Sequence, residues 1–153
     1  DLVTGYGHGA GWTKNSNDRA HDMSADARDY FRSLVDIEEP THIQQRFAGF
    51  RVPPRAVIDG HPVDLLVGLQ RGHPPTTFYF DQQSGLLVRV LRYTQTPIGP
   101  NPVQANYADY RAVGGMKVPF RRTFIQSRSQ YTIQLHQVQE NAPVDDSQFM
   151  KPM

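Results

Sequence analysis

The sequence predicts an α+β fold of mostly β structure, in which a curved antiparallel meander sheet, or half-barrel, is covered by one amphipathic helix. Three observations support this prediction. From residue 43 onward, apolar and polar side chains alternate with the period of two that is typical of strands. Turn signals separate these runs roughly every twelve residues, as a meander requires. A helical pattern of apolar residues occurs once, ahead of the strands.

Composition excludes several classes of protein. The chain has 153 residues, of which 38% are hydrophobic and 10% aromatic, so it can form a hydrophobic core and is not disordered. No stretch approaches the length of apolar sequence that crosses a membrane as a helix. Since it contains no cysteine, it has no disulfide, thiolate metal site or covalently attached c-type haem. A net charge of +1 gives no strong field for nucleic acid, so we expect no nucleic-acid partner.

The distribution of charge and of apolar residues divides the chain into two parts of unequal length. Residues 1–40 carry a net charge of −4 and residues 41–153 a net charge of +5. We expect residues 1–23 to be an irregular, Gly-rich and polar segment, and residues 24–153 to form one domain. That domain comprises a helix over 24–39, a sheet over 43–140 and a C-terminal tail over 141–153. Because the chain opens at Asp1 without a methionine or a signal peptide, we expect a processed product or a fragment.

Capping and spacing locate the helix. Ser24 is a good N-cap and Asp26 suits the first turn, where the helix dipole favours negative charge. Pro40 ends the helix. The apolar stripe that would face the sheet repeats at intervals of three and four residues and consists of Ala27, Phe31, Leu34 and Ile37.

Turn residues divide the rest of the chain. Asp59-Gly60 and Gly114-Gly115 predict tight hairpins with positive φ, and Ser127–Gln130 predicts a third. The run from Asp81 to Gly85 fits a type I turn closed by glycine. Thr94–Pro102 is expected to be a longer, Pro-rich loop. Six or seven strands result, with one apolar and one wet face, and one helix is too small to cover the apolar face. The sheet therefore holds either a cavity or a filled core.

Motifs that indicate catalysis are absent. The sequence lacks G-x-S-x-G, H-E-x-x-H, a P-loop and an EF-hand loop. The glycines of residues 5–11 do not spell G-x-G-x-x-G, and the six histidines do not have the spacing of a metal site. We therefore expect no enzyme, no metal site and no cofactor.

Arginines gather on the later strands. Their simplest interpretation is a solvated outer face, which also protects the sheet against edge-to-edge association. The alternative is a docking surface for an acidic partner or for phospholipid head groups. The candidate docking residues are Arg89, Arg92, Arg111, Arg121 and Arg122.

Several phrases in the C-terminal two-thirds carry a resemblance to a known family. They are Phe80–Arg89 (FDQQSGLLVR), Tyr93–Pro102, Asn106–Arg111 (NYADYR), Val113–Phe120 (VGGMKVPF) and Val138–Pro152. This wording resembles the LolA/LolB-like superfamily of outer-membrane lipoprotein-sorting proteins. It is most similar to the version at the C-terminus of bacterial reaction-centre cytochrome c-like proteins. The resemblance covers residues 43–152 and rests on turns, strand ends and a C-terminal segment that anchors the end of the chain.

The resemblance implies a half-open antiparallel sheet whose apolar concave face accepts an acyl chain in the bacterial periplasm, without catalysis or metal. The first hypothesis is therefore a non-enzymatic carrier of lipid or lipoprotein acyl chains. The second is a structural or interaction domain with a filled core, whose partner is a c-type cytochrome or another envelope protein. The residues expected to line the concave face are Phe31, Leu34, Phe78, Phe80, Leu86, Val88, Val90, Phe120, Phe124, Tyr131, Ile133 and Leu135.

Overall fold

The structure is a computed structural model that describes residues 2–7, 10–25, 27–28, 31–32, 42–96 and 98–152. The chain forms two compact units. Residues 1–37 and 141–153 make up the small unit, and residues 38–140 make up the large unit. Within the described residues, no helix combines the length and the hydropathy of a membrane-spanning segment.

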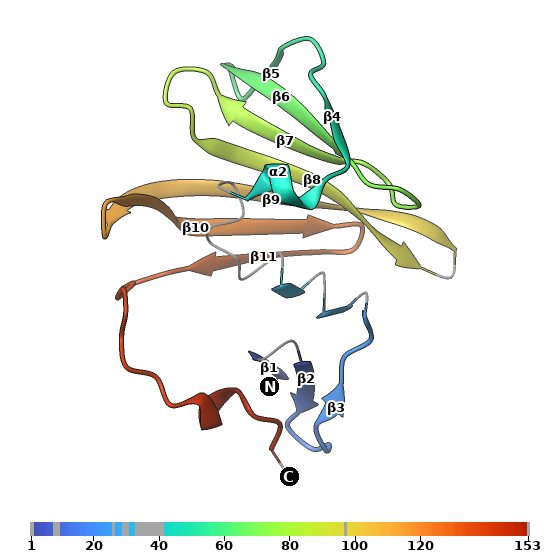
Figure 1. Cartoon of the computed structure of the whole chain (residues 1–153), viewed down its shortest axis with the longest axis vertical. Helices are drawn as coiled ribbons and strands as arrows, with labels where there is room; N and C mark the ends of the chain where they lie inside the picture. Colours follow the sequence, from blue (N-terminus) through green and yellow to red (C-terminus); the bar gives the residue numbers. More distant parts are fainter. Residues whose placement is uncertain are drawn as a thin grey trace. The chain divides into compact units, whose positions relative to one another are not determined.

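The large unit is built on one open, eight-stranded antiparallel sheet (Figure 1). The strands lie in the order β11-β10-β9-β8-β7-β6-β4, and β5 pairs with β6 on the same side as β4. Each strand from β6 to β11 pairs with its neighbour in the chain, which confirms the predicted antiparallel meander. The strands are β4 (Gly49–Arg51), β5 (Ala56–Ile58), β6 (His61–Leu69), β7 (Thr76–Asp81), β8 (Leu87–Thr96), β9 (Gly99–Val113), β10 (Met116–Gln126) and β11 (Ser129–Gln134).

Tight turns join these strands where the sequence predicts them. Asp59 and Gly60 have φ values of 50° and 83°, and Gly114 and Gly115 have values of 53° and 83°. Positive φ at both central residues matches the twist of the flanking strands, which explains the Asp-Gly and Gly-Gly pairs. In the turn before β8, Gly85 has a φ of 70° and its N–H donates a 2.8 Å hydrogen bond to the Asp81 carbonyl.

The expected Pro-rich loop over Thr94–Pro102 is instead the tip of a long hairpin. Strand β8 continues to Thr96, β9 begins at Gly99, and the two residues pair directly. Pro100 and Pro102 belong to β9 but precede Gln104, where the pairing of β9 with β10 ends. The missing proline N–H groups therefore leave no gap in the ladder between β9 and β10.

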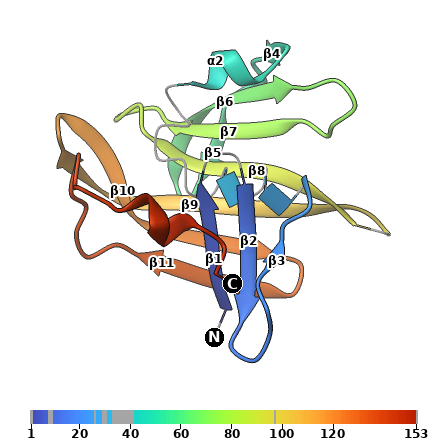
Figure 2. The same ribbon diagram turned by 60° about the horizontal axis from the view of Figure 1, so that its bottom comes forward.

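The small unit holds a three-stranded antiparallel sheet of β1 (Leu2–Gly7), β2 (Ala10–Asn15) and β3 (His21–Asp22), seen side by side in Figure 2. This corrects the prediction of an irregular segment over residues 1–23. Two glycines let other side chains pack closely on the hairpin. A Cβ at Gly5 would overlap the indole of Trp12, its direct cross-strand partner, and a Cβ at Gly11 would lie 2.8 Å from Sδ of Met23. The glycines thus make room for these side chains rather than supplying flexibility.

Two chain segments pack on this hairpin. On one side, the C-terminal 3₁₀ helix η2 (Asp146–Phe149) brings the Cβ of Phe149 within 2.9 Å of where a Cβ of Gly7 would lie. The Asp145 carboxylate caps η2 by accepting a 2.9 Å hydrogen bond from the Ser147 N–H, which lowers the pKa of Asp145. The second segment carries Phe31, whose ring lies 6.4 Å from that of Tyr6 on the hairpin. The C-terminal tail thus packs on the N-terminal strands.

The helix predicted over 24–39 falls mostly outside the described residues. Its first turn is described: the Ser24 Oγ accepts a 3.2 Å hydrogen bond from the Ala27 N–H, and the Arg28 N–H donates to the Ser24 carbonyl at 2.9 Å. A single amphipathic helix covering the sheet is not supported. In the described part of the large unit, the short helix α2 (Ile43–Arg46) packs on the sheet instead.

Candidate functional site

The candidate site is the apolar face of the large sheet, defined here as the face that carries Phe78 and Phe124. Cross-strand partners share a face, so the register fixes its membership. One row runs across six strands, because each residue is the direct partner of the next. From β6 to β11 this row is Leu66, Phe78, Val90, Ala105, Phe124 and Tyr131.

The β6–β8 end of the apolar face is filled by the chain's own side chains. Ile43 of α2 is 6% exposed and forms one buried cluster with Phe78, Leu87 and Val90, which are 0%, 4% and 1% exposed. The ring of Phe47, directly after α2, lies edge-on to Phe78 with centroids 5.7 Å apart. A helix of four residues gains little from backbone hydrogen bonds, so this packing holds it in place.

The β10–β11 end of the apolar face is more open. Phe120 and Phe124 of β10 are 5% and 1% exposed. On β11, however, Tyr131 and Ile133 are each 40% exposed, although both lie on the apolar face. The ring of Tyr131 stacks on Phe124, with centroids 5.0 Å apart and planes inclined at 24°. This end therefore presents apolar surface to solvent beside a rigid aromatic pair.

Eight residues predicted to line the site share the apolar face. Phe78 and Phe80 lie on it in β7, and Val90 lies on it in β8. Leu135 follows β11 and its N–H donates a 2.8 Å hydrogen bond to the Phe120 carbonyl, which continues the pairing of β10 with β11. The remaining members are Phe120, Phe124, Tyr131 and Ile133.

A β-bulge changes the membership in β8. Tyr79 pairs with Arg89 but Phe80 pairs with Leu87, so Val88 is an extra residue between them. Leu87 and Val90 consequently share the apolar face, whereas the predicted set of Leu86, Val88 and Val90 is wrong in its first two members. Leu86 precedes β8, and its carbonyl accepts a 2.9 Å hydrogen bond from the Asp81 N–H.

Phe31, a further member of the prediction, belongs to the small unit, where it contacts Tyr6, and Leu34 is outside the described residues. The sequence reasoning also missed residues on the apolar face, although the four-residue interval between Ile43 and Phe47 signals a helical turn. The residues it missed are Ile43, Phe47, Phe50, Leu66, Leu87, Val103, Ala105, Tyr107 and Val118.

The opposite face of the sheet carries a polar row over β8 to β11, but over β6 it is apolar, because Val63 and Val67 lie on it and are 1% and 9% exposed. The polar row consists of Arg89, Asn106, Thr123 and Thr132. The Arg89 Nε donates a 2.8 Å hydrogen bond to the Asn106 Oδ1, and the hydroxyl oxygens of Thr123 and Thr132 are 3.0 Å apart. These bonds link β8 to β9 and β10 to β11. The expectation of one wet face therefore holds for this part of the sheet and is wrong at β6.

The predicted arginine surface is divided by the register. Arg89 and Arg121 lie on the polar face. Arg92, which pairs with Val103, and Arg122, which pairs with Tyr107 and Ile133, lie on the apolar face. Arg122 is 7% exposed, so it does not belong to a docking surface. The Arg111 guanidinium pairs with the Asp109 carboxylate at 2.7 Å, which lowers the pKa of Asp109.

A half-buried tyrosine joins β8 to β9. The Tyr110 hydroxyl donates a 2.5 Å hydrogen bond to the Leu87 carbonyl, next to the bulge. Burial raises the pKa of Tyr110 far above its ordinary value, and the positive charge of Arg122 partly offsets this shift. Tyr110 is therefore neutral under all ordinary conditions and holds the bulged segment in place.

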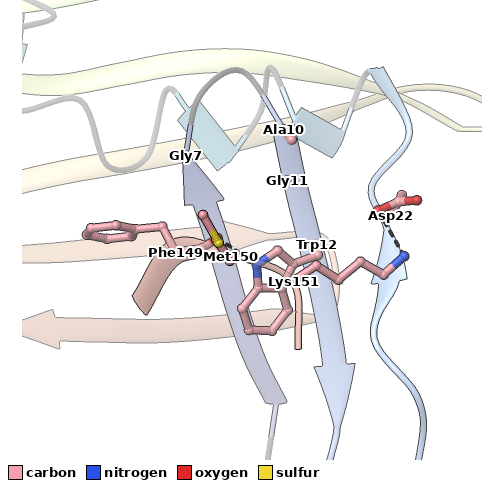
Figure 3. A pocket seen from close by; sticks show the side chains of 8 residues that line it. All are labelled: Gly7, Ala10, Gly11, Trp12, Asp22, Phe149, Met150 and Lys151. Carbon is pink, nitrogen blue, oxygen red and sulfur yellow. Dashed lines mark hydrogen bonds and ion pairs between the residues drawn. The ribbon is translucent and has the colours of Figure 1, made fainter. Parts of the chain in front are cut away.

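The small unit contains a separate shallow cavity of about 250 Å³ (Figure 3). The Trp12 indole, Phe149 and Met150 contribute apolar surface, and the Lys151 ammonium forms a 3.0 Å ion pair with the Asp22 carboxylate beside it. The Trp12 Nε1 donates a 2.9 Å hydrogen bond to the Phe149 carbonyl. Its two charged groups neutralise each other, so the cavity offers no excess charge to a ligand.

Comparison with a solved structure shows that the fold is LolA-like. The structure is similar to that of a LolA superfamily protein from Nitrosomonas europaea, with a TM-score of 0.51 and 12% sequence identity. The likeness covers 93% of this chain and 66% of the other, so the chain spans slightly less than two-thirds of that protein. No protein-family model and no curated protein matches the chain.

Proposed function

We propose that the chain is a non-enzymatic carrier domain of the bacterial periplasm, which binds one acyl chain of a lipid or lipoprotein on the apolar face of its open sheet. The observation that carries this proposal is the six-strand apolar row from Leu66 to Tyr131, which ends at side chains that remain 40% exposed. The LolA-like fold supports it, because the sequence resemblance implies acyl-chain binding for this architecture.

The acyl chain would bind at the β10–β11 end of the apolar face. Ile43 and Phe47 already fill the β6–β8 end, which leaves no room for a ligand there. Beside β11, the stacked pair of Phe124 and Tyr131 offers a flat aromatic wall, and Ile133 extends it. Burying these side chains under an acyl chain would be favourable by about 25 cal/mol for each Å² removed from water.

The second candidate function is a structural domain of a cytochrome-containing envelope complex, with the same fold and a filled core. The filling of the β6–β8 end by α2 favours it. The two functions differ in one observable, since a carrier takes up a free acyl chain and a filled core does not.

The test is a titration of the delipidated chain with a fluorescent fatty-acyl probe. We expect saturable binding by the wild type and a loss of at least about tenfold in affinity for Ile133→Glu, which places a charge on the apolar face. Gln130→Glu is the matched control, because Gln130 is an exposed residue of the same strand on the polar face. A folded wild type that takes up no probe, or equal losses in both variants, would overturn the carrier proposal.

A further inference from the structure

Among the residues that the structure describes, strand β11 forms one edge of the large sheet. It pairs with β10 on one side, and all six of its residues are exposed. Natural proteins protect such edges with lysine, proline, bulges or very short strands, because a row of unpaired backbone groups templates pairing with another strand. The sequence SQYTIQ of β11 has no charge and no proline, and its pairing with β10 has no bulge.

The other edge of the sheet is protected in these ways. It consists of β4 and β5, each three residues long, which pair with opposite ends of β6. Pro53 and Pro54 separate the two strands, and Arg51 and Arg55 add charge. Because this edge cannot extend the sheet, β11 is the edge at which a further strand would add.

The direction of the β11 backbone groups follows from one hydrogen bond. The Leu135 N–H donates to the Phe120 carbonyl, so this pair is a hydrogen-bonded pair of the ladder. Antiparallel ladders alternate between residues that bond to the partner strand and residues that do not. The backbone groups of Gln130, Thr132 and Gln134 therefore point away from β10, toward the open edge.

We propose that β11 pairs antiparallel with β11 of a second copy of this chain, with the two Thr132 residues opposite each other on a two-fold axis. Gln130 then lies opposite Gln134 of the second copy, and Tyr131 opposite Ile133 of the second copy. A symmetric interface requires each surface to complement itself. This register meets that requirement at every position of the strand.

Side-chain chemistry favours a second copy of this chain as the partner of β11. On the apolar face, the register creates two pairs of an aromatic with a β-branched residue, which stabilise antiparallel strands. Both members, Tyr131 and Ile133, are 40% exposed in the single chain, and this pairing covers their edges while it leaves the apolar face open to an acyl chain. On the polar face, the register pairs threonine with threonine and glutamine with glutamine, so hydrogen bonds form without like-charge repulsion. Since the other edge is protected, association stops at the dimer.

Sedimentation velocity over a range of concentrations tests the dimer. We expect the wild-type chain to dimerise reversibly. Thr132→Lys and Thr132→Glu each place like charges opposite each other on the axis, so each alone should raise the dimer dissociation constant by about fivefold or more. An equal mixture of the two should restore dimerisation as a mixed species. A wild type that stays monomeric at all concentrations, or a mixture that dimerises no better than its components, would overturn the proposal.

Cross-linking tests the register independently. Because the chain contains no cysteine, single-cysteine variants give no background. Thr132→Cys should form a disulfide dimer under mild oxidation, and an equal mixture of Gln130→Cys and Gln134→Cys should form a mixed dimer. Gln83→Cys, in the exposed turn before β8, measures random collision. Circular dichroism checks that each variant is folded. Cross-linking of Thr132→Cys no faster than that of Gln83→Cys would contradict the proposed pairing.

Discussion

The Trp12 indole Nε1 donates a 2.9 Å hydrogen bond to the carbonyl of Phe149, a residue 137 positions later in the chain. Trp12 is 7% exposed, and it lies flat over Gly5, its cross-strand partner. Within the small unit, this hydrogen bond, the Trp12 ring and the Lys151–Asp22 ion pair join the two ends of the described chain. The N-terminal segment, whose glycines alone would suggest flexibility, therefore contributes to the stability of the small unit.

The indole hydrogen bond makes a first prediction. Trp12→Phe retains an aromatic ring but removes the donor, so we expect a loss of about 1 kcal/mol in the free energy of unfolding of the small unit. Trp12→Ala should cost about 3–5 kcal/mol, because it leaves a cavity. Denaturation by urea, followed by circular dichroism, measures both, since Trp12 is the only tryptophan and its fluorescence is lost with it.

The exposed ion pair beside it provides the control for Trp12. The Lys151 ammonium and the Asp22 carboxylate are 3.0 Å apart, but their side chains are 41% and 79% exposed. Exposed pairs contribute little, so Lys151→Gln should change stability by less than about 1 kcal/mol. If Trp12→Phe proved no more harmful than Lys151→Gln, the contact with Phe149 would have no importance for stability.

Two glycines in strands should respond in opposite directions to alanine. At Gly5, a Cβ would lie 2.3 Å from Cε2 of Trp12, so Gly5→Ala must displace the indole and should cost about 1–3 kcal/mol. At Gly49 in β4, a Cβ would meet nothing within 4 Å, so Gly49→Ala should stabilise the chain by about 0.5–1 kcal/mol. Thermal unfolding of both variants shows the contrast, and destabilisation of equal size in both would refute the steric explanation.

The turn before β8 should make stability depend on pH. Asp81 Oδ1 accepts hydrogen bonds from the Ser84 hydroxyl and N–H at 2.6 and 2.7 Å, which lower the pKa of Asp81 below its ordinary value of 3.8. Because the folded state favours the ionised carboxylate, its contribution to stability is present above pH 3.8 and is lost as the pH falls through the lowered pKa.

Asp81→Asn removes this titration while it keeps a side-chain oxygen as acceptor. We expect the variant to be less stable than the wild type at neutral pH and to lose less stability on acidification below pH 3.8. Urea denaturation at several pH values measures the difference between the two curves. Parallel curves of stability against pH for the variant and the wild type would show that Asp81 does not contribute to the loss of stability at acidic pH.

The sequence predicts the hairpins well and the bulge poorly, for physical reasons. Positive φ is nearly confined to glycine, asparagine and aspartate, so Asp59-Gly60 and Gly114-Gly115 identify their turns by chemistry alone. In contrast, Leu86, Leu87 and Val88 are three apolar residues in succession, which give no alternation from which to choose a face. The Tyr110 hydrogen bond to the Leu87 carbonyl comes from a different strand, and no local pattern reveals it.

The N-terminal strands and the full membership of the apolar face could not be predicted, because they depend on contacts between residues distant in sequence. Glycines at alternate positions of residues 5–11 suggest flexibility until Trp12 and Phe149 are seen to pack against Gly5 and Gly7. Similarly, α2 lacks a side-chain cap and is too short to be recognised by propensity, because burial of Ile43 stabilises it. Alternation did place eight of the predicted residues on the apolar face, since strand period requires no knowledge of partners.

The last prediction concerns Ile43, which decides how much of the apolar face is filled. Its side chain is 6% exposed in the cluster with Phe78, Leu87 and Val90, so Ile43→Ala should cost about 2–5 kcal/mol. Val57→Ala is the control, because Val57 in β5 is 69% exposed and its truncation should change stability by less than about 0.5 kcal/mol. If both variants unfolded at the wild-type urea midpoint, α2 would not be a packed cover of the sheet. A large loss for Ile43→Ala together with tighter uptake of an acyl probe would show that α2 occupies space a ligand can use.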